Sequence, residues 1–151
     1  MKIRELNNNE CKNIAINYLT HEYCHYHKSE VLTPQDYEVF VEKIRQTNCA
    51  TYCTEDGKSA VIMTRNHDKF NSQYVSIVFV NEPDRNKGIA TTLLLHAIEM
   101  SPNGVSLHVN ADNNIAYNLY RKLGFKPYGM QMPMREIFMA TKKGLGGREN
   151  W

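Results

Sequence analysis

The stretch that decides the fold is "VFVNEPDRNKGIATTLLLHAIE", residues 78–99. An apolar strand ends at Val80, a polar turn follows, and apolar residues recur at helical spacing after Gly88. A helix that begins inside such a turn points its first unpaired backbone N–H groups, and the positive end of its dipole, at one spot. Because helix N-termini of this kind bind anions, the sequence predicts a binding site for a diphosphate.

The residue types in the turn suit this interpretation. Gly88 and Ala90 are small where a phosphate has to approach the backbone, and Arg85 and Lys87 add positive charge. Two familiar phosphate-binding loops fit badly, because the turn has one glycine and neither the P-loop spacing nor the G-x-G-x-x-G spacing of dinucleotide-binding folds. Nucleotide hydrolysis and nicotinamide chemistry are therefore disfavoured.

Composition sets bounds on the rest of the chain. A length of 151 residues with 42% hydrophobic residues fits one globular domain. The formal charge of +2 gives no electrostatic reason to expect a nucleic acid or another polyanion as partner. Neither a secretory signal nor a membrane span is indicated, so we expect a cytoplasmic protein whose four cysteines are reduced thiols.

Outside the quoted stretch, residue patterns predict the other elements. Thr33 and Pro34 suit the start of a helix over 33–46, and Asp56-Gly57 suits a tight hairpin between two strands within 49–65. The apolar run over 74–80 is typical of a central strand that is buried on both faces. The remaining expected elements are strands over 2–6, 104–109, 125–132 and 134–142 and helices over 7–19, 88–100 and 113–123.

These elements define an α/β chain of the α+β type. Their order is β-αα-βββ-α-β-α-ββ, which predicts a mixed central sheet of about six to seven strands. We expect a single domain over residues 1–141, followed by a flexible C-terminal tail over 142–151, where three glycines offer few anchors.

Two motifs together carry a resemblance to a known family. "RNKGIA", residues 85–90, resembles motif A of the GNAT superfamily of acyl-CoA-dependent N-acetyltransferases, R/Q-x-x-G-x-G/A. "LHVNADNNIAYNLYRKLGF", residues 107–125, is similar to the family's second segment, L-x-V…N-x-x-A-x-x-L-Y-x-x-x-G-F, at the family's spacing. The element order also agrees with the family fold. The second segment's pattern positions are held by Asn113, Ala116, Leu119, Tyr120, Gly124 and Phe125.

The resemblance implies a GNAT-like domain that uses acetyl-CoA as co-substrate and requires no metal. Tyr120 matches the family tyrosine that lies beside the sulfur of coenzyme A, and a backbone N–H near Val80 is a candidate oxyanion donor. The cofactor-binding residues that follow from the two motifs are Val78, Val80, Arg85, Asn86, Lys87, Gly88, Ile89, Ala90, Asn113 and Tyr120.

Acyl transfer from a thioester to an amine needs a neutral amine, a polarised carbonyl and a proton for the departing thiolate. Tyr120 is a suitable proton donor, and His108 is a candidate general base because an imidazole titrates near neutral pH. Some family members place a glutamate on the central strand where this chain has Tyr74, so a direct carboxylate base is in doubt. Glu82 and a relayed water molecule are alternatives.

"HEYCHYH", residues 21–27, contains the H-E-x-x-H pattern of zinc hydrolases. That pattern needs a long helix and a third ligand, whereas this stretch lies where the first helix is expected to end. In the family arrangement the same connection borders the acceptor groove. We therefore expect Tyr23, His25 and Tyr26 to contact the acceptor, and adventitious metal binding stays an alternative.

The sequence thus predicts an N-acetyltransferase in which a primary amine attacks acetyl-CoA directly in a ternary complex. The acceptor is a small amine or a protein amino group; a homodimer is left open, and neither a membrane nor nucleic acid is indicated. The alternative is a catalytically weak or inactive acyl-CoA-binding module with a regulatory role. Such a module would keep the anion-binding turn but would not need Tyr120 as a proton donor.

Overall fold

The computed structural model describes residues 2–7, 14, 16, 18–19, 34–45, 49–65 and 72–141. The strands are β1 (Ile3–Glu5), β2 (Cys49–Thr54), β3 (Ala60–Arg65), β4 (Gln73–Phe79), β5 (Val105–Asn110), β6 (Lys126–Gln131) and β7 (Glu136–Ala140). The helices are α3 (Pro34–Arg45), the short 3-10 helix η3 (Glu82–Asp84), α4 (Ile89–Glu99) and α5 (Asn114–Lys122). The predicted order of elements and the mixed α/β class are confirmed. The short helix η3 was not predicted. Most of the helix expected over 7–19 and the tail over 142–151 lie outside the described residues.

The strands form a seven-stranded mixed sheet in the order β1-β2-β3-β4-β5-β7-β6. β4 and β5 are parallel, and helix α4 provides the crossover that a parallel pair requires. β1 pairs with β2, and β7 pairs with both β5 and β6, in antiparallel fashion. In the register of the β4–β5 pair, Gln73 lies opposite Val105 and Tyr74 lies opposite Ser106.

The chain divides into two units, one formed from residues 1–62 and 77–93 and the other from residues 63–76 and 94–151. In the first unit, part of the core is a cluster of fully or nearly fully buried side chains: Ile14, Cys53, Ala60 and Ile62. Leu6, Phe40, Val41 and Ile77 pack against this cluster. Each buried aliphatic side chain of this size contributes about 1.5–3 kcal/mol to folding, so the cluster fixes helix α3 on the β2–β3 hairpin.

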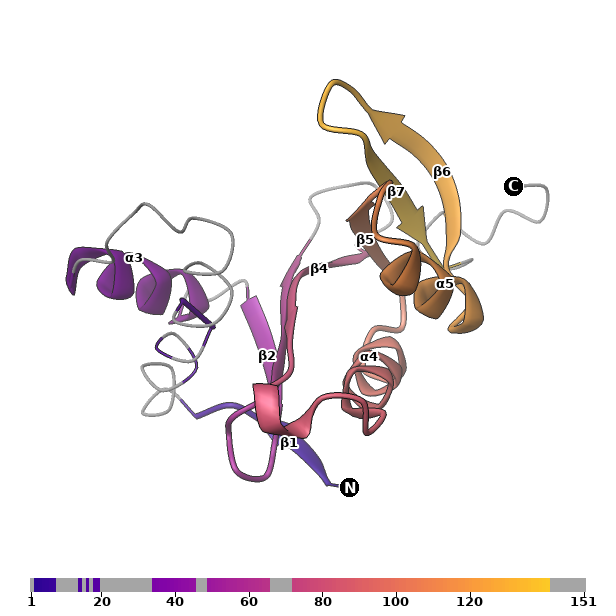
Figure 1. Ribbon diagram of the computed structural model, residues 1–151. Coiled ribbons are helices and arrows are strands. Elements are labelled where there is room, and N and C mark those ends of the chain that lie inside the picture. Colours follow the sequence, from indigo (N-terminus) through magenta and orange to yellow (C-terminus); the bar gives the residue numbers. More distant parts are fainter. Residues whose placement is uncertain are drawn as a thin grey trace. The chain divides into compact units, whose positions relative to one another are not determined.

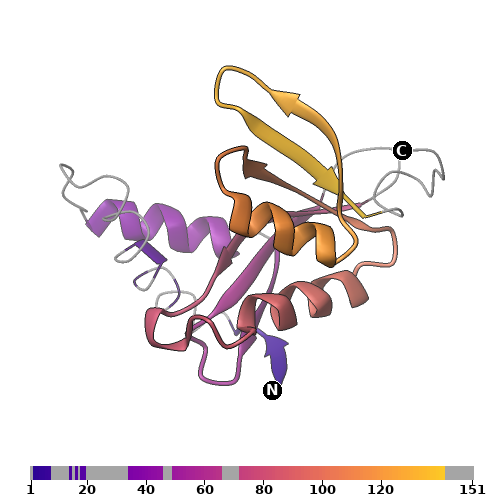
Figure 2. The same cartoon turned by 45° about the vertical axis from the view of Figure 1, so that its right-hand side comes forward.

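In the second unit, β5, β7 and β6 lie side by side (Figures 1 and 2). Alternate side chains of β5 face the core, since Val105, Leu107 and Val109 are buried, whereas His108 and Asn110 are exposed. The pairing of His108 with Phe138 places these two residues on the same face of the sheet. β6 is exposed along its length, as befits the edge strand of the sheet.

β4 differs from the prediction of a strand buried on both faces. Only Val75 and Phe79 are buried, and the other five side chains are half-buried. The physical reason lies in the polar members of the run, because Tyr74 directs its hydroxyl at the exposed ring of His108 instead of into the core. A run of apolar and aromatic residues is compatible with two kinds of strand. One is buried on both faces of the sheet, and in the other an aromatic side chain lies at the protein surface.

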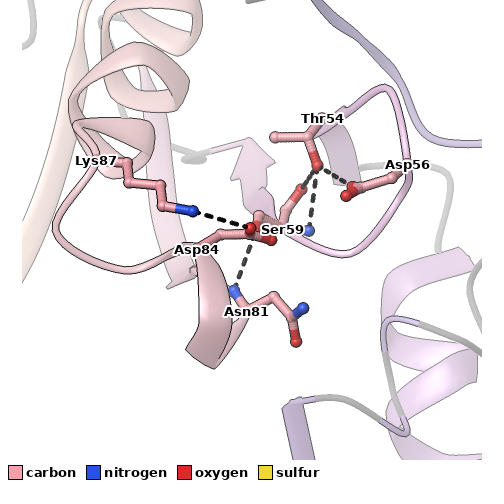
Figure 3. A network of polar contacts seen from close by, with 6 residues as sticks. All are labelled: Thr54, Asp56, Ser59, Asn81, Asp84 and Lys87. Atoms are coloured by element: carbon pink, nitrogen blue, oxygen red, sulfur yellow. Dashed lines mark hydrogen bonds and ion pairs between the residues drawn. The ribbon is translucent and has the colours of Figure 1, made fainter.

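The β2–β3 hairpin turns at Asp56-Gly57, as the sequence predicts (Figure 3). Gly57 adopts a φ of +71°, which favours glycine. Thr54 Oγ1 donates to Asp56 Oδ1 at 2.6 Å, and the backbone N–H of Lys58 donates to the same oxygen at 3.0 Å. These hydrogen bonds, the one from Thr54 above all, hold the pKa of the Asp56 carboxyl below its usual value.

Ser59 connects this hairpin to the end of β4 (Figure 3). Its buried Oγ accepts a hydrogen bond of 2.9 Å from the backbone N–H of Asn81, the residue that precedes η3. A backbone donor in a partly buried site needs a partner, and this serine provides it. The hydroxyl therefore helps to fix the start of the turn that leads into α4.

Replacing Ser59 by Ala should lower the free energy of unfolding by about 1–3 kcal/mol, because the Asn81 N–H would lose its acceptor. Urea denaturation of the variant measures this loss. Ser101→Ala is the matched control, since Ser101 is also buried but only donates to a helix carbonyl, that of Ala97. Equal losses in the two variants would contradict the special role of Ser59.

Candidate functional site

The predicted anion-binding turn lies in the first unit, between the end of β4 and the start of α4. Two residues in the turn have positive φ angles, Asn86 at +64° and Gly88 at +78°. A Cβ built on Gly88 would meet no atom within 4 Å, so the space in front of this residue is open. The conformation favours glycine, and the open space suits a ligand that approaches the backbone closely.

Unpaired backbone donors are concentrated at the same place. The backbone N–H of Thr92 bonds to the Gly88 carbonyl at 3.1 Å and closes the first turn of α4, and Thr92 Oγ1 donates to the same carbonyl at 3.0 Å. The N–H groups of residues 88–91 precede this bond and therefore have no partner one turn earlier in the helix. Together with the helix dipole they form the donor set that a diphosphate would use.

The two basic side chains of the turn, Arg85 and Lys87, each have a partner within the protein. Arg85 Nε donates to the Val80 carbonyl at 3.1 Å and so holds the turn against the end of β4. Lys87 Nζ lies 3.9 Å from Asp84 Oδ1, an exposed contact that offsets part of the lysine's charge (Figure 3). Sequence reasoning did not weigh Asp84, although its spacing of three residues from Lys87 gives a signal. A larger role of the backbone amides than of these side chains in binding an anion is therefore a prediction.

A pocket of about 350 Å³ in the first unit does not suit a diphosphate. Three carboxylates contribute to its lining, which would repel a polyanion. The lining residues are Lys2, Thr54, Glu55, Asp56, Asp84 and Ile89. The amides at the start of α4 therefore stay the predicted anion site, and the lining of this pocket does not favour an alternative there.

Tyr120 lies in the second unit, on α5. Its ring contacts the fully buried Phe125 edge-on, with centroids 5.9 Å apart, and Gly124 provides the turn between them with a φ of +97°. The Tyr120 carbonyl accepts from the Phe125 N–H at 3.0 Å. Burial raises the pKa of the Tyr120 hydroxyl above its usual value, so this hydroxyl keeps its proton throughout the neutral range.

Asn113, predicted to bind the cofactor, is the N-cap of α5. Its Oδ1 accepts a hydrogen bond of 3.1 Å from the backbone N–H of Ala116. This interaction accounts for the N-x-x-A part of the second motif by helix capping alone. A contact between Asn113 and the cofactor stays a prediction.

His108, the predicted base, belongs to a small polar and aromatic cluster of the second unit. Tyr74 Oη lies 3.5 Å from His108 Nε2, and Glu136 Oε2 lies 3.6 Å from the same nitrogen. The rings of His108 and Phe138 are 6.0 Å apart. Sequence reasoning missed Glu136, since only the pairing register of β5 with β7 brings it to His108.

The other predicted residues fall into two groups. Val78, Val80 and the turn residues 85–90 belong to the first unit, together with the solvent-exposed Glu82. Tyr23, His25 and Tyr26, with the rest of the H-E-x-x-H stretch, lie outside the described residues. Within the described ranges, no group of three or more His, Cys, Asp or Glu side chains could hold a metal ion, and no helix is long and apolar enough to cross a membrane.

Comparison with known proteins relates these features to other chains. One relative is the cysteine-rich protein 2-binding protein of Homo sapiens, 44% identical over 59 residues, which are 38% of this chain and 7% of that protein. Another is the peptidyl-lysine N-acetyltransferase YjaB of Salmonella typhimurium, 33% identical over 57 residues, which are 38% of this chain and 39% of that protein. The chain thus spans only a minor part of the curated relatives it matches.

Solved structures share the fold over almost the whole chain. The PaiA N-acetyltransferase of Thermoplasma acidophilum, solved in complex with coenzyme A, has a TM-score of 0.67 at 14% identity, covering 93% of this chain and 97% of its own. At that identity the likeness concerns the fold alone. The family model described as acetyltransferase (GNAT) family matches residues 16–125, which include both motifs, the anion-binding turn and Tyr120. The chain therefore belongs to the GNAT family of acetyltransferases.

Proposed function

We propose that this protein transfers an acetyl group from acetyl-CoA to a primary amine by direct attack in a ternary complex. The observation that carries the proposal is the start of α4, where consecutive backbone N–H groups without helical partners surround the open space at Gly88. These amides bind the diphosphate of acetyl-CoA, and Arg85 stabilises the turn through the Val80 carbonyl. Acyl-CoA dependence agrees with membership of the family.

His108 and Tyr120 supply the acid–base chemistry in this proposal. His108 accepts a proton from the acceptor's ammonium group, which leaves the electron pair on nitrogen free to attack the thioester carbon. As the C–N bond forms and the C–S bond breaks, Tyr120 donates its hydrogen to the sulfur. A thiol, with a pKa of about 8.5, is a stronger acid than a tyrosine, so Tyr120 acts as a relay that recovers its proton from the attached amine nitrogen. The products are an amide, a thiol and one released proton.

The acceptor that we propose is the side-chain amine of a lysine, in a protein or a peptide. The bacterial relative is named for that activity, and its similarity to this chain supports the assignment. A lysine amine, with a pKa of about 10.4, is almost entirely protonated near neutral pH. Removal of a proton is therefore a necessary part of catalysis.

A second candidate function is acyl-CoA binding without turnover. It is favoured by Tyr74, which occupies the position where some family members carry a glutamate. The two candidates differ in what they require of Tyr120, because a binding module has no need of a proton donor. Release of free thiol from acetyl-CoA in the presence of lysine peptides separates them.

Acetyl-CoA should raise the melting temperature, and the shift should disappear in Gly88→Glu. At saturation of about 100 times Kd, ligand binding stabilises a folded protein by about 2.7 kcal/mol. A carboxylate at Gly88 would enter the open space and repel the diphosphate. Differential scanning fluorimetry with and without acetyl-CoA measures the shift.

The matched control for this experiment is Gly124→Glu. Gly124 also has a positive φ, +97°, and open space in front of its Cα, so both variants carry a similar backbone strain of about 1–2 kcal/mol. Gly124→Glu should keep the acetyl-CoA shift despite a lower melting temperature. A full shift in Gly88→Glu would refute the assignment of this turn.

Tyr120→Phe should lower kcat by about 10² or more while acetyl-CoA affinity changes little. The ring and its contact with Phe125 are retained, so the fold is preserved. Free-thiol detection with a lysine peptide as acceptor gives kcat, and calorimetry gives the affinity for acetyl-CoA. An unaltered kcat would leave solvent as the proton source.

The buried hydroxyl of Tyr120 also predicts a pH effect on stability. Below about pH 10 the hydroxyl is protonated in the folded and the unfolded chain, and no stability is lost. As the pH rises beyond that value the unfolded chain ionises first, because burial raises the folded pKa. Stability should therefore fall less steeply in Tyr120→Phe than in the wild type as the pH rises above about 10. Urea denaturation checks this, with Tyr117→Phe as the control for loss of a hydroxyl from α5.

A further inference from the structure

His108 lies on β5, two residues beyond the pairing of Tyr74 with Ser106. The ring of Tyr74 stacks on the ring of His108 with centroids 5.5 Å apart and planes inclined by 22°. Tyr74 Oη is 3.5 Å from His108 Nε2. Phe138, the direct partner of His108 across the β5–β7 pair, contacts the imidazole edge-on. The two aromatic rings restrict the orientation of the imidazole.

Glu136 reaches the same imidazole from the start of β7. Because side chains alternate along a strand, Glu136 and Phe138 point to the same face as His108. The Oε2 atom of Glu136 is 3.6 Å from His108 Nε2, and the two side chains are 26% and 37% exposed. The pair is therefore partly shielded from water but still accessible to a substrate.

The neighbouring cation does not compete for Glu136. Arg135 precedes it in the chain and has its guanidinium 3.1 Å from Asp112 Oδ1. This ion pair is exposed, with side-chain exposures of 55% and 74%, so it contributes little to stability. The carboxylate of Glu136 is thus available to balance a positive charge on His108.

Resting on the acetyl transfer proposed above, we infer that Glu136 is the carboxylate partner of the proton-accepting histidine. An N–H bond of the acceptor's ammonium group breaks, the proton passes to the imidazole of His108, and the electron pair stays on the amine nitrogen. Glu136 stabilises the resulting imidazolium by charge, and Tyr74 and Phe138 hold its plane. The carboxylate that some family members carry at the position of Tyr74 is replaced here by one that comes from β7.

The test compares two acceptors of similar size, ethylamine and 2,2,2-trifluoroethylamine. Near neutral pH ethylamine is almost fully protonated, whereas the fluorinated amine is mostly neutral and needs no base before attack. Glu136→Gln should lower kcat/KM for ethylamine on the order of tenfold, the effect of removing one close charge partner from a protonated group. The loss for trifluoroethylamine should be less than about threefold, which also reports that the variant is folded.

Two further variants make the result specific. Glu99→Gln removes a solvent-exposed carboxylate at the end of α4, in the same unit, and it should leave both acceptors unaffected. His108→Gln should reproduce the acceptor-dependent loss at about 10², and adding Glu136→Gln to it should cause no further loss, because Glu136 acts through the imidazole.

Equal losses for both amines in Glu136→Gln, or a full additional loss in the double variant, would overturn the role of Glu136 while leaving the acetyltransferase assignment in place. A wild-type protein that releases no thiol from acetyl-CoA with either amine or with lysine peptides would instead contradict the proposed function itself, and with it the role of Glu136. Each outcome thus separates the two assignments.

Discussion

The constraint on which the rest of the structure depends is the parallel pairing of β4 with β5. The two strands pair at Gln73 with Val105 and at Tyr74 with Ser106. A parallel connection requires a crossover, and the crossover helix α4 has to begin close to the end of β4. The first backbone amides of α4 consequently follow soon after β4 in the chain. The diphosphate site of the proposed function thus follows from the topology of the sheet.

The sequence predicts those parts of the fold and site that depend on local chemistry. The turn at Asp56-Gly57, the crossover after Val80 and the start of α5 at Asn113 all use residues whose conformational preferences are local. The same holds for Gly88, where a positive φ and a close approach to the backbone both favour glycine. Membership of the family was predicted from two motifs that include these positions.

What the sequence could not predict depends on register or on neighbours in space. Glu136 is adjacent to His108 only because β7 returns antiparallel to β5, and a shift of one residue would have put it on the opposite face. The burial of β4 was overestimated for the same reason, since the position of Tyr74 against an exposed histidine is not encoded in its own strand. The contact of Lys87 with Asp84 likewise involves a residue that lies outside the motif.

The location of Glu136 at the turn end of the β6–β7 hairpin, opposite Gln131, has an evolutionary consequence. The hairpin carries exposed side chains of Tyr128, Met130, Met132 and Met134. When the catalytic carboxylate lies on a central strand, the sequence of an edge hairpin can change without moving that carboxylate. In this chain the carboxylate and the exposed apolar side chains lie on one hairpin, so a change to the hairpin has to preserve its register or lose the partner of His108.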